Sequence, residues 1–351
     1  MSKENREAPL SLWVALLPLL FLIVMLASSV YLFHDNASYG PNQIALMLSA
    51  GAAAVIGLLR GEKWNEIEQA IVHGISLAMK ACLILLAVGS LIGSWMLAGT
   101  APTVIYAGLG ILDPSWFYPA ALIICALVAV SIGSSWTTAG TIGIALMGIS
   151  QIMDLSLPIT AGAVISGSYF GDKMSPLSDT TNLAPGVAGT DVFSHVRHMI
   201  FTTGPSLLIA LVLYTVIGLR RGTSQIASLE GIDTILATLQ ANYLISPWLL
   251  LPPVLVIAMV IYRIPALPAL LLGAVIGGVV ALIAQGASLA AVMEAAQTGI
   301  VSETGVAAVD ELLGRGGMES MLSTVALIIC ALSFGGIMER TGMLSVIAGA
   351  V

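Results

Sequence analysis

The chain has 351 residues, of which 58% are hydrophobic and 9% are charged. Soluble globular domains carry about 25% charged residues, so this composition excludes a soluble fold. The charged residues are 12 basic and 19 acidic ones without a basic patch, which argues against nucleic-acid binding. Apolar runs of about 20 residues without strict alternation predict an all-α polytopic membrane protein embedded in a lipid bilayer.

The first part of the chain alternates apolar runs with short polar loops. Membrane spans are expected at roughly residues 10–33, 42–59, 72–97 and 116–132, with a less apolar segment at 100–112 along the membrane interface. Lys3 and Arg6 precede the first span, and Arg60 and Lys63 follow the second. The positive-inside rule therefore predicts that the N-terminus and the 60–68 loop are cytoplasmic.

Residues 131–150 differ in character, because a cluster of hydroxyl residues lies between Ser134 and Thr141 with glycines among them. We interpret this stretch as a re-entrant hairpin or a broken helix that brings hydroxyl groups to membrane depth. The alternative is a helix–helix contact face built from small residues. The hydroxyls are clustered rather than spaced at helical intervals, which favours the first interpretation.

The stretch 167–190 is the most unusual part of the sequence. Pro176 and Pro185 prevent a continuous helix, because proline lacks a backbone N–H and clashes with the preceding turn. Two carboxylates, Asp172 and Asp179, lie in the same stretch among hydroxyl residues. Broken, charged backbone is tolerated at membrane depth where it lines a cavity enclosed by protein, and discontinuous helices are typical of a transporter's ion site.

Four further spans are expected in the rest of the chain, at roughly 199–219, 247–261, 267–283 and 321–338. Weak matches predict an internal repeat, in which residues 84–99 resemble 328–342 and Gly93 pairs with Gly336. The expected organisation is a first repeat at 1–221, a connecting segment at 222–245 and an incomplete second repeat at 246–351. This register predicts that the second repeat is truncated by about 100 residues. The halves are parallel if 134–152 re-enters and inverted if it crosses.

Four segments carry a family resemblance: GDKMSPLSDTTNLAP at 171–185, GSSWTT at 133–138, GGMESM at 316–321 and FGGIME at 334–339. Together they resemble the NhaC family of Na⁺/H⁺ antiporters, and the resemblance covers nearly the whole chain. It implies inverted repeats with paired hairpins, often with a scaffold that forms a homodimer. It also implies exchange of Na⁺ for H⁺, or in close relatives malate/lactate exchange coupled to these ions, by a multi-pass protein of a bacterial inner membrane.

Sodium is a hard cation that prefers oxygen ligands, and a carboxylate in a partly dehydrated cavity has its pKa raised towards the range where protons compete. Asp172 and Asp179 are therefore the candidate exchanging carboxylates, and Asp179 is favoured because hydroxyl and amide residues adjoin it. The other candidate Na⁺ ligands are Ser178, Thr180, Thr181 and Asn182 in the same stretch, and Ser134, Ser135, Thr137 and Thr138 in the hydroxyl-rich stretch. No residue pattern indicates a cofactor.

Three more charged residues are candidate proton or charge partners of the site: Lys80, Lys173 and Glu339. Each candidate has a structural alternative. Both aspartates are alternatively helix caps, and Asp172 alternatively pairs with Lys173. Lys80 is alternatively a snorkelling or ion-paired residue, and Glu339 an interfacial charge beside Arg340.

Other function classes fit the sequence less well. An exchanger of small carboxylates needs a basic residue in the site, and Lys173 is the one near it. A passive channel has less use for charged, proline-broken helices than an alternating-access transporter has. An intramembrane hydrolase needs a base beside its serine, and no such motif stands out. We therefore expect a transporter and not an enzyme.

Overall fold

The protein is described by a computed structural model that covers residues 10–111, 113–132, 135–175, 178, 181, 191–222, 229–262, 264–306, 309–310, 313–314 and 316–350. Within these ranges the regular elements are helices and no strand occurs, which confirms the predicted all-α class. Six of the described helices are long and apolar enough to cross a membrane: Leu12–Phe33, Pro41–Leu59, Trp64–Leu97, Phe193–Arg220, Leu267–Ala284 and Met318–Arg340. The chain is therefore a multi-pass membrane protein.

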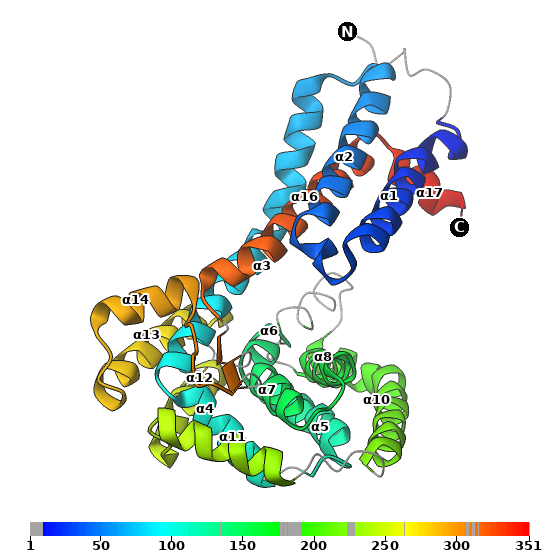
Figure 1. Ribbon diagram of the computed structural model, residues 1–351. Helices are drawn as coiled ribbons and strands as arrows, with labels where there is room; N and C mark the ends of the chain where they lie inside the picture. The colour runs from blue at the N-terminus through cyan, green and yellow to red at the C-terminus, as the bar shows by residue number, and fades with distance from the viewer. Residues whose placement is uncertain are drawn as a thin grey trace. The chain divides into compact units, whose positions relative to one another are not determined.

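The helices pack into two compact units, one made of residues 1–85 and 321–351 and the other of residues 86–320 (Figure 1). This division follows packing and differs from the boundaries expected for the repeat. The internal repeat itself stays a prediction. We describe each unit by itself.

The first unit contains two spans joined by a short turn, α1 (Leu12–Phe33) and α2 (Pro41–Leu59), together with α16 (Leu322–Arg340), α17 (Met343–Ala350) and the part of α3 (Trp64–Leu97) up to residue 85. Helix α2 packs against both α1 and α16. Small and branched apolar residues fill the core between these helices, including Ala50, Ala53, Ile67 and Ile337. Apolar side chains also cover the outer surface, as expected where lipid is the solvent.

Two kinds of contact fix the first unit. The buried side chain of Gln43 accepts a hydrogen bond from the Gly40 amide at 2.9 Å and donates to the carbonyl oxygens of Ser38 at 2.8 Å and Ser323 at 3.0 Å. It thereby ties the η1 turn (His34–Tyr39) and the start of α2 to the start of α16. Further along, α3 and α16 touch through glycines, because a Cβ on Gly74 would lie 3.4 Å from the Cα of Gly336.

The second unit contains the remaining helices, which are shorter on average than those of the first. They are the rest of α3, α4 (Thr100–Ile111), α5 (Phe117–Ile132), α6 (Ser135–Thr138), η2 (Ala139–Gly143), α7 (Ile144–Ile152), α8 (Leu157–Met174), α10 (Val192–Gly222), α11 (Leu229–Asn242), η3 (Pro247–Leu250), α12 (Leu251–Ile261), α13 (Ala266–Ala284) and α14 (Leu289–Thr298). Its main core gathers around the aromatic pair Phe117 and Tyr118, whose rings meet edge to face.

Helices α5 and α8 form the closest helix pair of the second unit. Gly167 and Gly171 lie on the contact face of α8, where a Cβ on Gly171 would come within 2.5 Å of the Ala126 carbonyl oxygen and of the Ala129 Cβ. Small residues spaced four apart let two helix backbones approach closely in a membrane. This seam determines where the C-terminal end of α8 lies relative to α5.

The structure differs from the predicted spans at three places. Helix α3 begins at Trp64 rather than near Val72, because Ile67 is buried on an otherwise polar first turn that a hydropathy scan passes over. Helix α10 begins at Val192 rather than near Met199. The helices Leu236–Asn242 and Pro247–Met259 together are apolar enough for one span but are bent by 93°.

Candidate functional site

The stretch 167–190 is interrupted where the prolines predict it. Helix α8 ends at Met174, and Ser175 is extended with φ −86° and ψ 125°. The residue before a proline is disfavoured in the helical region, and Pro176 follows. The last turn of α8 therefore presents its carbonyl oxygens without helical partners, at the negative end of the helix dipole.

Asp172 lies in this last turn and contacts the hydroxyl-rich stretch. The Ser135 hydroxyl donates to Asp172 Oδ2 at 2.9 Å, across 37 residues of sequence. Ser135 is buried, and Asp172 is half-buried. The structure thus joins the two stretches that the sequence singled out, through one carboxylate and one hydroxyl.

The segment that carries Ser135 is an irregular helix. It runs as α6, then as a π-helical turn at Ala139–Gly143, and then as α7. The described residues 135–152 follow one continuous helical path, so the choice between a re-entrant or broken helix and a small-residue contact face stays a prediction. A π-helical turn loosens the regular hydrogen-bond ladder and is frequent at functional sites. Gly143 in this turn packs on α8, since its Cβ would lie 2.6 Å from Val164 Cγ1.

Thr181 closes the end of α8 from the other side. Its hydroxyl donates to the carbonyl oxygens of Asp172 at 3.0 Å and Lys173 at 3.2 Å, and its amide lies 3.4 Å from Ser178 Oγ. Ser175, Ser178 and Thr181 are all buried. Hydroxyl groups therefore surround the helix end that carries Asp172.

The structure describes part of the predicted ligand set. Asp172, Ser135, Ser178 and Thr181 lie around the end of α8, and Thr138 is fully buried at the start of the π-helical turn. Four predicted residues lie outside the described residues: Ser134, Asp179, Thr180 and Asn182. Thr137 belongs to α6, and its side chain is not among those described.

The three predicted charge partners are all exposed residues. Lys173 is exposed, and it forms no ion pair with Asp172 within the described part of the chain. Lys80 and Glu339 are exposed residues of the first unit. Arg340 forms ion pairs with Glu62 at 3.3 Å and Glu66 at 3.1 Å, rather than with the neighbouring Glu339 alone.

Sequence reasoning passed over two features of the site. The first is the Gly167–Gly171 seam, although two glycines spaced four apart are a known signal of close helix contact. The second is a set of further buried hydroxyls in and next to the helices that carry the site: Ser150, Thr160, Ser168 and Ser175. Two of these, Ser150 and Thr160, share a hydrogen bond of 2.6 Å between α7 and α8.

This arrangement suits a small, hard cation. A carboxylate, several hydroxyls and the carbonyl oxygens of a helix end are the oxygen donors that alkali and alkaline-earth ions prefer. A carboxylate that binds a proton loses its charge and with it most of its attraction for a cation.

Comparison with known proteins agrees with this chemistry. The model of the Na⁺/H⁺ antiporter family matches residues 167–351. The chain is 40% identical over 327 residues to the malate-2H⁺/Na⁺-lactate antiporter of Bacillus subtilis, covering 93% of this chain and 68% of that protein. It is 40% identical over 302 residues to the Na⁺/H⁺ antiporter NhaC of Alkalihalophilus pseudofirmus, covering 86% of this chain and 65% of that protein.

A third relative is named for a different pair of substrates. The chain is 39% identical over 342 residues to the arginine/ornithine antiporter ArcD of Halobacterium salinarum, covering 95% of this chain and 68% of that protein. The chain thus spans about two-thirds of the length of these relatives. No solved structure was found to match it. The family match and the three relatives show that the chain belongs to the Na⁺/H⁺ antiporter family.

Proposed function

We propose that this protein is a secondary active transporter that exchanges Na⁺ for H⁺ across the membrane. Family membership supports the reaction, and the Na⁺/H⁺ antiporters among the relatives support these two ions. The bacterial relatives support a place in the inner membrane of a bacterium. The observation that carries the proposal is the contact of the Asp172 carboxylate with the Ser135 hydroxyl at an interrupted helix end.

Exchange follows from competition for one carboxylate. In the sodium-loaded state, Asp172 gives a charged oxygen and the buried hydroxyls give neutral ones, so the ion is held without its full water shell. In the proton-loaded state, Asp172 is neutral and the site carries no cation. The empty, charged state is the most costly to move through the membrane, which couples the two fluxes.

Asp179 is the second proposed exchanging carboxylate. Its support is the sequence alone: it shares the proline-broken stretch with Asp172 and adjoins Thr180 and Asn182. Two carboxylates in one site would hold a sodium ion more tightly than one, since each adds a charged oxygen ligand.

A second candidate function is exchange of small organic ions coupled to Na⁺ and H⁺. Its support is the similarity to the malate-2H⁺/Na⁺-lactate antiporter, which is as high as that to NhaC. Recognition of an organic carboxylate would require a basic group in the site, whereas Lys173 near Asp172 is exposed.

Flux in liposomes tests the proposal. Liposomes that contain the 351-residue chain and are acidic inside should take up radioactive Na⁺ as protons leave. Asp172→Asn should reduce uptake to the level of protein-free liposomes, whereas the charge-matched variant Asp113→Asn, in an exposed loop, should transport normally.

Two outcomes would contradict the proposal. Proton-driven Na⁺ uptake that survives Asp172→Asn would remove Asp172 from the site. Absence of that uptake together with malate/lactate exchange would favour the second candidate. Asp179→Asn, measured in parallel, tests the second carboxylate.

A further inference from the structure

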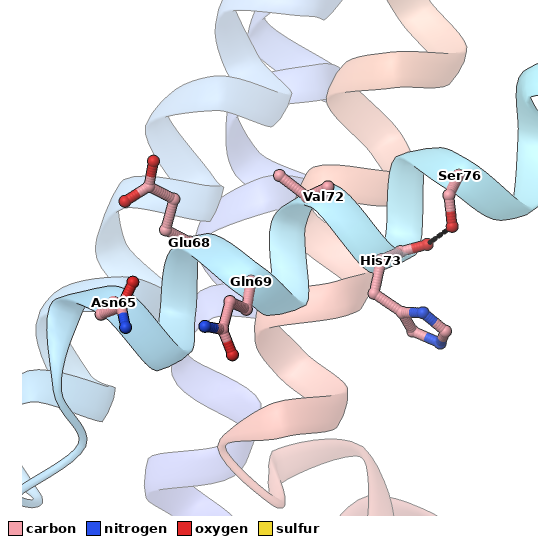
Figure 2. Close-up of a pocket in the computed structure, with 6 residues that line it drawn as sticks. All are labelled: Asn65, Glu68, Gln69, Val72, His73 and Ser76. Atoms are coloured by element: carbon pink, nitrogen blue, oxygen red, sulfur yellow. Dashed lines mark hydrogen bonds between the residues drawn. The ribbon is translucent and has the colours of Figure 1, made fainter.

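A polar stripe runs along the exposed side of α3 in the first unit. Six residues line a hollow of about 470 Å³ there: Asn65, Glu68, Gln69, Val72, His73 and Ser76. Figure 2 shows these side chains along one stretch of α3, and five of the six are polar or titratable. The opposite side of the same stretch, with Ile67 and Gly74, is buried against α2 and α16.

The stripe runs beside a helix that is long and apolar enough to cross a membrane. A Cβ on Gly74 would lie 2.5 Å from the carbonyl oxygen of Leu332, so this part of α3 runs beside α16, which is itself long and apolar enough to cross a membrane. Leu332 is about 12 Å along the helix from Arg340 at its end, at 1.5 Å per residue. His73 and Ser76 lie within two residues of Gly74 and are therefore beside the interior of α16, whereas Glu68 is nearer its charged end.

Contact with lipid would be unfavourable for such a polar surface. Carboxylate, amide and imidazole groups cannot be satisfied by hydrocarbon, and intramembrane polar residues face protein or a water-filled cavity. The exposed face of α1 in the same unit is different, because it is apolar throughout its middle, as at Ile23 and Val24. The two surfaces of one unit are thus built for two different surroundings.

We propose that the α3 stripe faces water and forms a cation-attracting entrance that leads from the membrane surface at Glu68 towards Ser76. The hollow gives room for water, and the amide and hydroxyl groups can replace part of a cation's hydration shell. Ser76 donates its hydroxyl hydrogen to the His73 carbonyl at 2.6 Å, and its oxygen keeps two lone pairs that can bind a cation or accept from water. The Glu68 carboxylate raises the local concentration of cations by its charge. The entrance would serve the proposed exchange of cations, but it is testable without transport.

Cysteine labelling tests the entrance. In a background with Cys82, Cys125 and Cys330 replaced by alanine, Gln69→Cys and Ser76→Cys should react with a membrane-impermeant cationic thiol reagent in intact membranes. Val24→Cys, in the middle of the apolar α1 surface, should not react. Labelling after denaturation in detergent should be equal for all three variants, which checks that each thiol is intact.

Charge preference tests the role of Glu68. At Gln69→Cys the cationic reagent should react faster than an anionic reagent of similar size, and Glu68→Gln should reduce this rate ratio by a factor of roughly five at low salt. Stripe cysteines that are as unreactive as Val24→Cys, whether lipid or a second protein surface covers them, would overturn the proposal. So would reactive cysteines without charge preference. Neither result depends on transport, so failure here is distinguishable from failure of the proposed function.

Discussion

The role proposed for Asp172 depends on its position at a helix end. Had α8 continued, the carbonyl oxygens of its last turn would be bound in the helix, and the carboxylate would be one acid on a helix surface. Because the helix stops at Met174, the Asp172 carboxylate meets the Ser135 hydroxyl, and the carbonyl oxygens of Asp172 and Lys173 accept from the Thr181 hydroxyl instead of a helical amide. The chemistry therefore depends on an interruption as much as on an acidic residue.

The Ser135 hydroxyl is the first residue-scale test. In the proposed mechanism, Ser135→Ala removes a sodium ligand and a donor that stabilises the ionised carboxylate, so protonation competes more strongly. We expect the Na⁺ concentration for half-maximal uptake to rise about tenfold, since a hydrogen bond to a charged group contributes about 1.5–3 kcal/mol. Thr202→Ala removes an exposed hydroxyl of α10 and is the control. Equal half-saturation in both variants would speak against Ser135 as a ligand.

Asp310, which is not a candidate ion ligand, holds a loop together by hydrogen bonds. Its oxygens accept hydrogen bonds from the Thr304 amide at 2.6 Å, the Thr304 hydroxyl at 2.7 Å, the Ser302 hydroxyl at 2.9 Å and the Gly305 amide at 3.1 Å. These bonds, that from the Thr304 amide first, lower the pKa of Asp310 below its ordinary value of 3.8.

The lowered pKa of Asp310 predicts an acid-sensitive loop. A carboxyl group whose pKa is lower in the folded state stabilises the fold above its ordinary pKa, and this contribution is lost as the pH falls through the lowered value. Amide hydrogen exchange at Thr304 and Gly305, corrected for its intrinsic rate, should show protection at about pH 6 that is lost as the pH falls below the ordinary pKa of 3.8. In Asp310→Asn the protection should be weak at both values. Protection that is independent of pH in the unmodified chain would contradict this account.

At the scale of helices, the α5–α8 seam holds the site together. Gly171 adjoins Asp172 in sequence, so whatever separates α8 from α5 also moves the carboxylate. The packing of Gly143 against Val164 likewise holds the π-helical turn against α8. Small residues thus position the polar ones.

Gly171→Ala tests the seam. The added methyl group would lie 2.5 Å from the Ala126 carbonyl oxygen, which is closer than a Cβ normally comes to backbone. We expect destabilisation of about 1–3 kcal/mol, as for overpacked cores, seen as a lower melting temperature in detergent. Gly335→Ala is the matched control, because nothing lies within 4 Å of a Cβ at that helical position. Equal melting temperatures for the two variants would exclude a tight seam.

Gln43 plays the corresponding role in the first unit. Gln43→Leu leaves the Gly40 amide and the Ser323 carbonyl without this partner, and an unsatisfied buried polar group costs about 1–3 kcal/mol. The variant should melt earlier than Gln240→Leu, which removes an exposed glutamine that bonds the Tyr106 hydroxyl. A Gln43→Leu protein as stable as this control would show that the polar contact is dispensable.

For the molecule as a whole, the sequence was most informative where one local property decides the outcome. Long apolar runs predicted the spans, since a bilayer admits few alternatives to a helix, and Pro176 predicted the end of α8. The motif that includes Asp172 predicted the family, which the family match confirmed. These features depend on neighbouring residues in sequence.

Features that depend on distant residues were not predictable in the same way. Several hydroxyl residues were candidate partners of Asp172. The hydroxyl that contacts it, on Ser135, is 37 residues away in sequence, and the packing that brings the two together cannot be predicted from the residues next to Ser135. The early start of α3 depends on what covers Ile67. The 93° bend before Pro247 falls where the sequence predicts a connecting segment followed by one membrane span.

The most direct test of the central claim is proton release on sodium binding. Adding Na⁺ to the purified 351-residue chain in a weakly buffered detergent solution, near neutral pH, should release protons that a pH indicator detects. Asp172→Asn should release markedly fewer, and Asp113→Asn should behave like the unmodified chain. Sodium binding without proton release, or release that is unchanged in Asp172→Asn, would contradict competition of the two ions for this carboxylate.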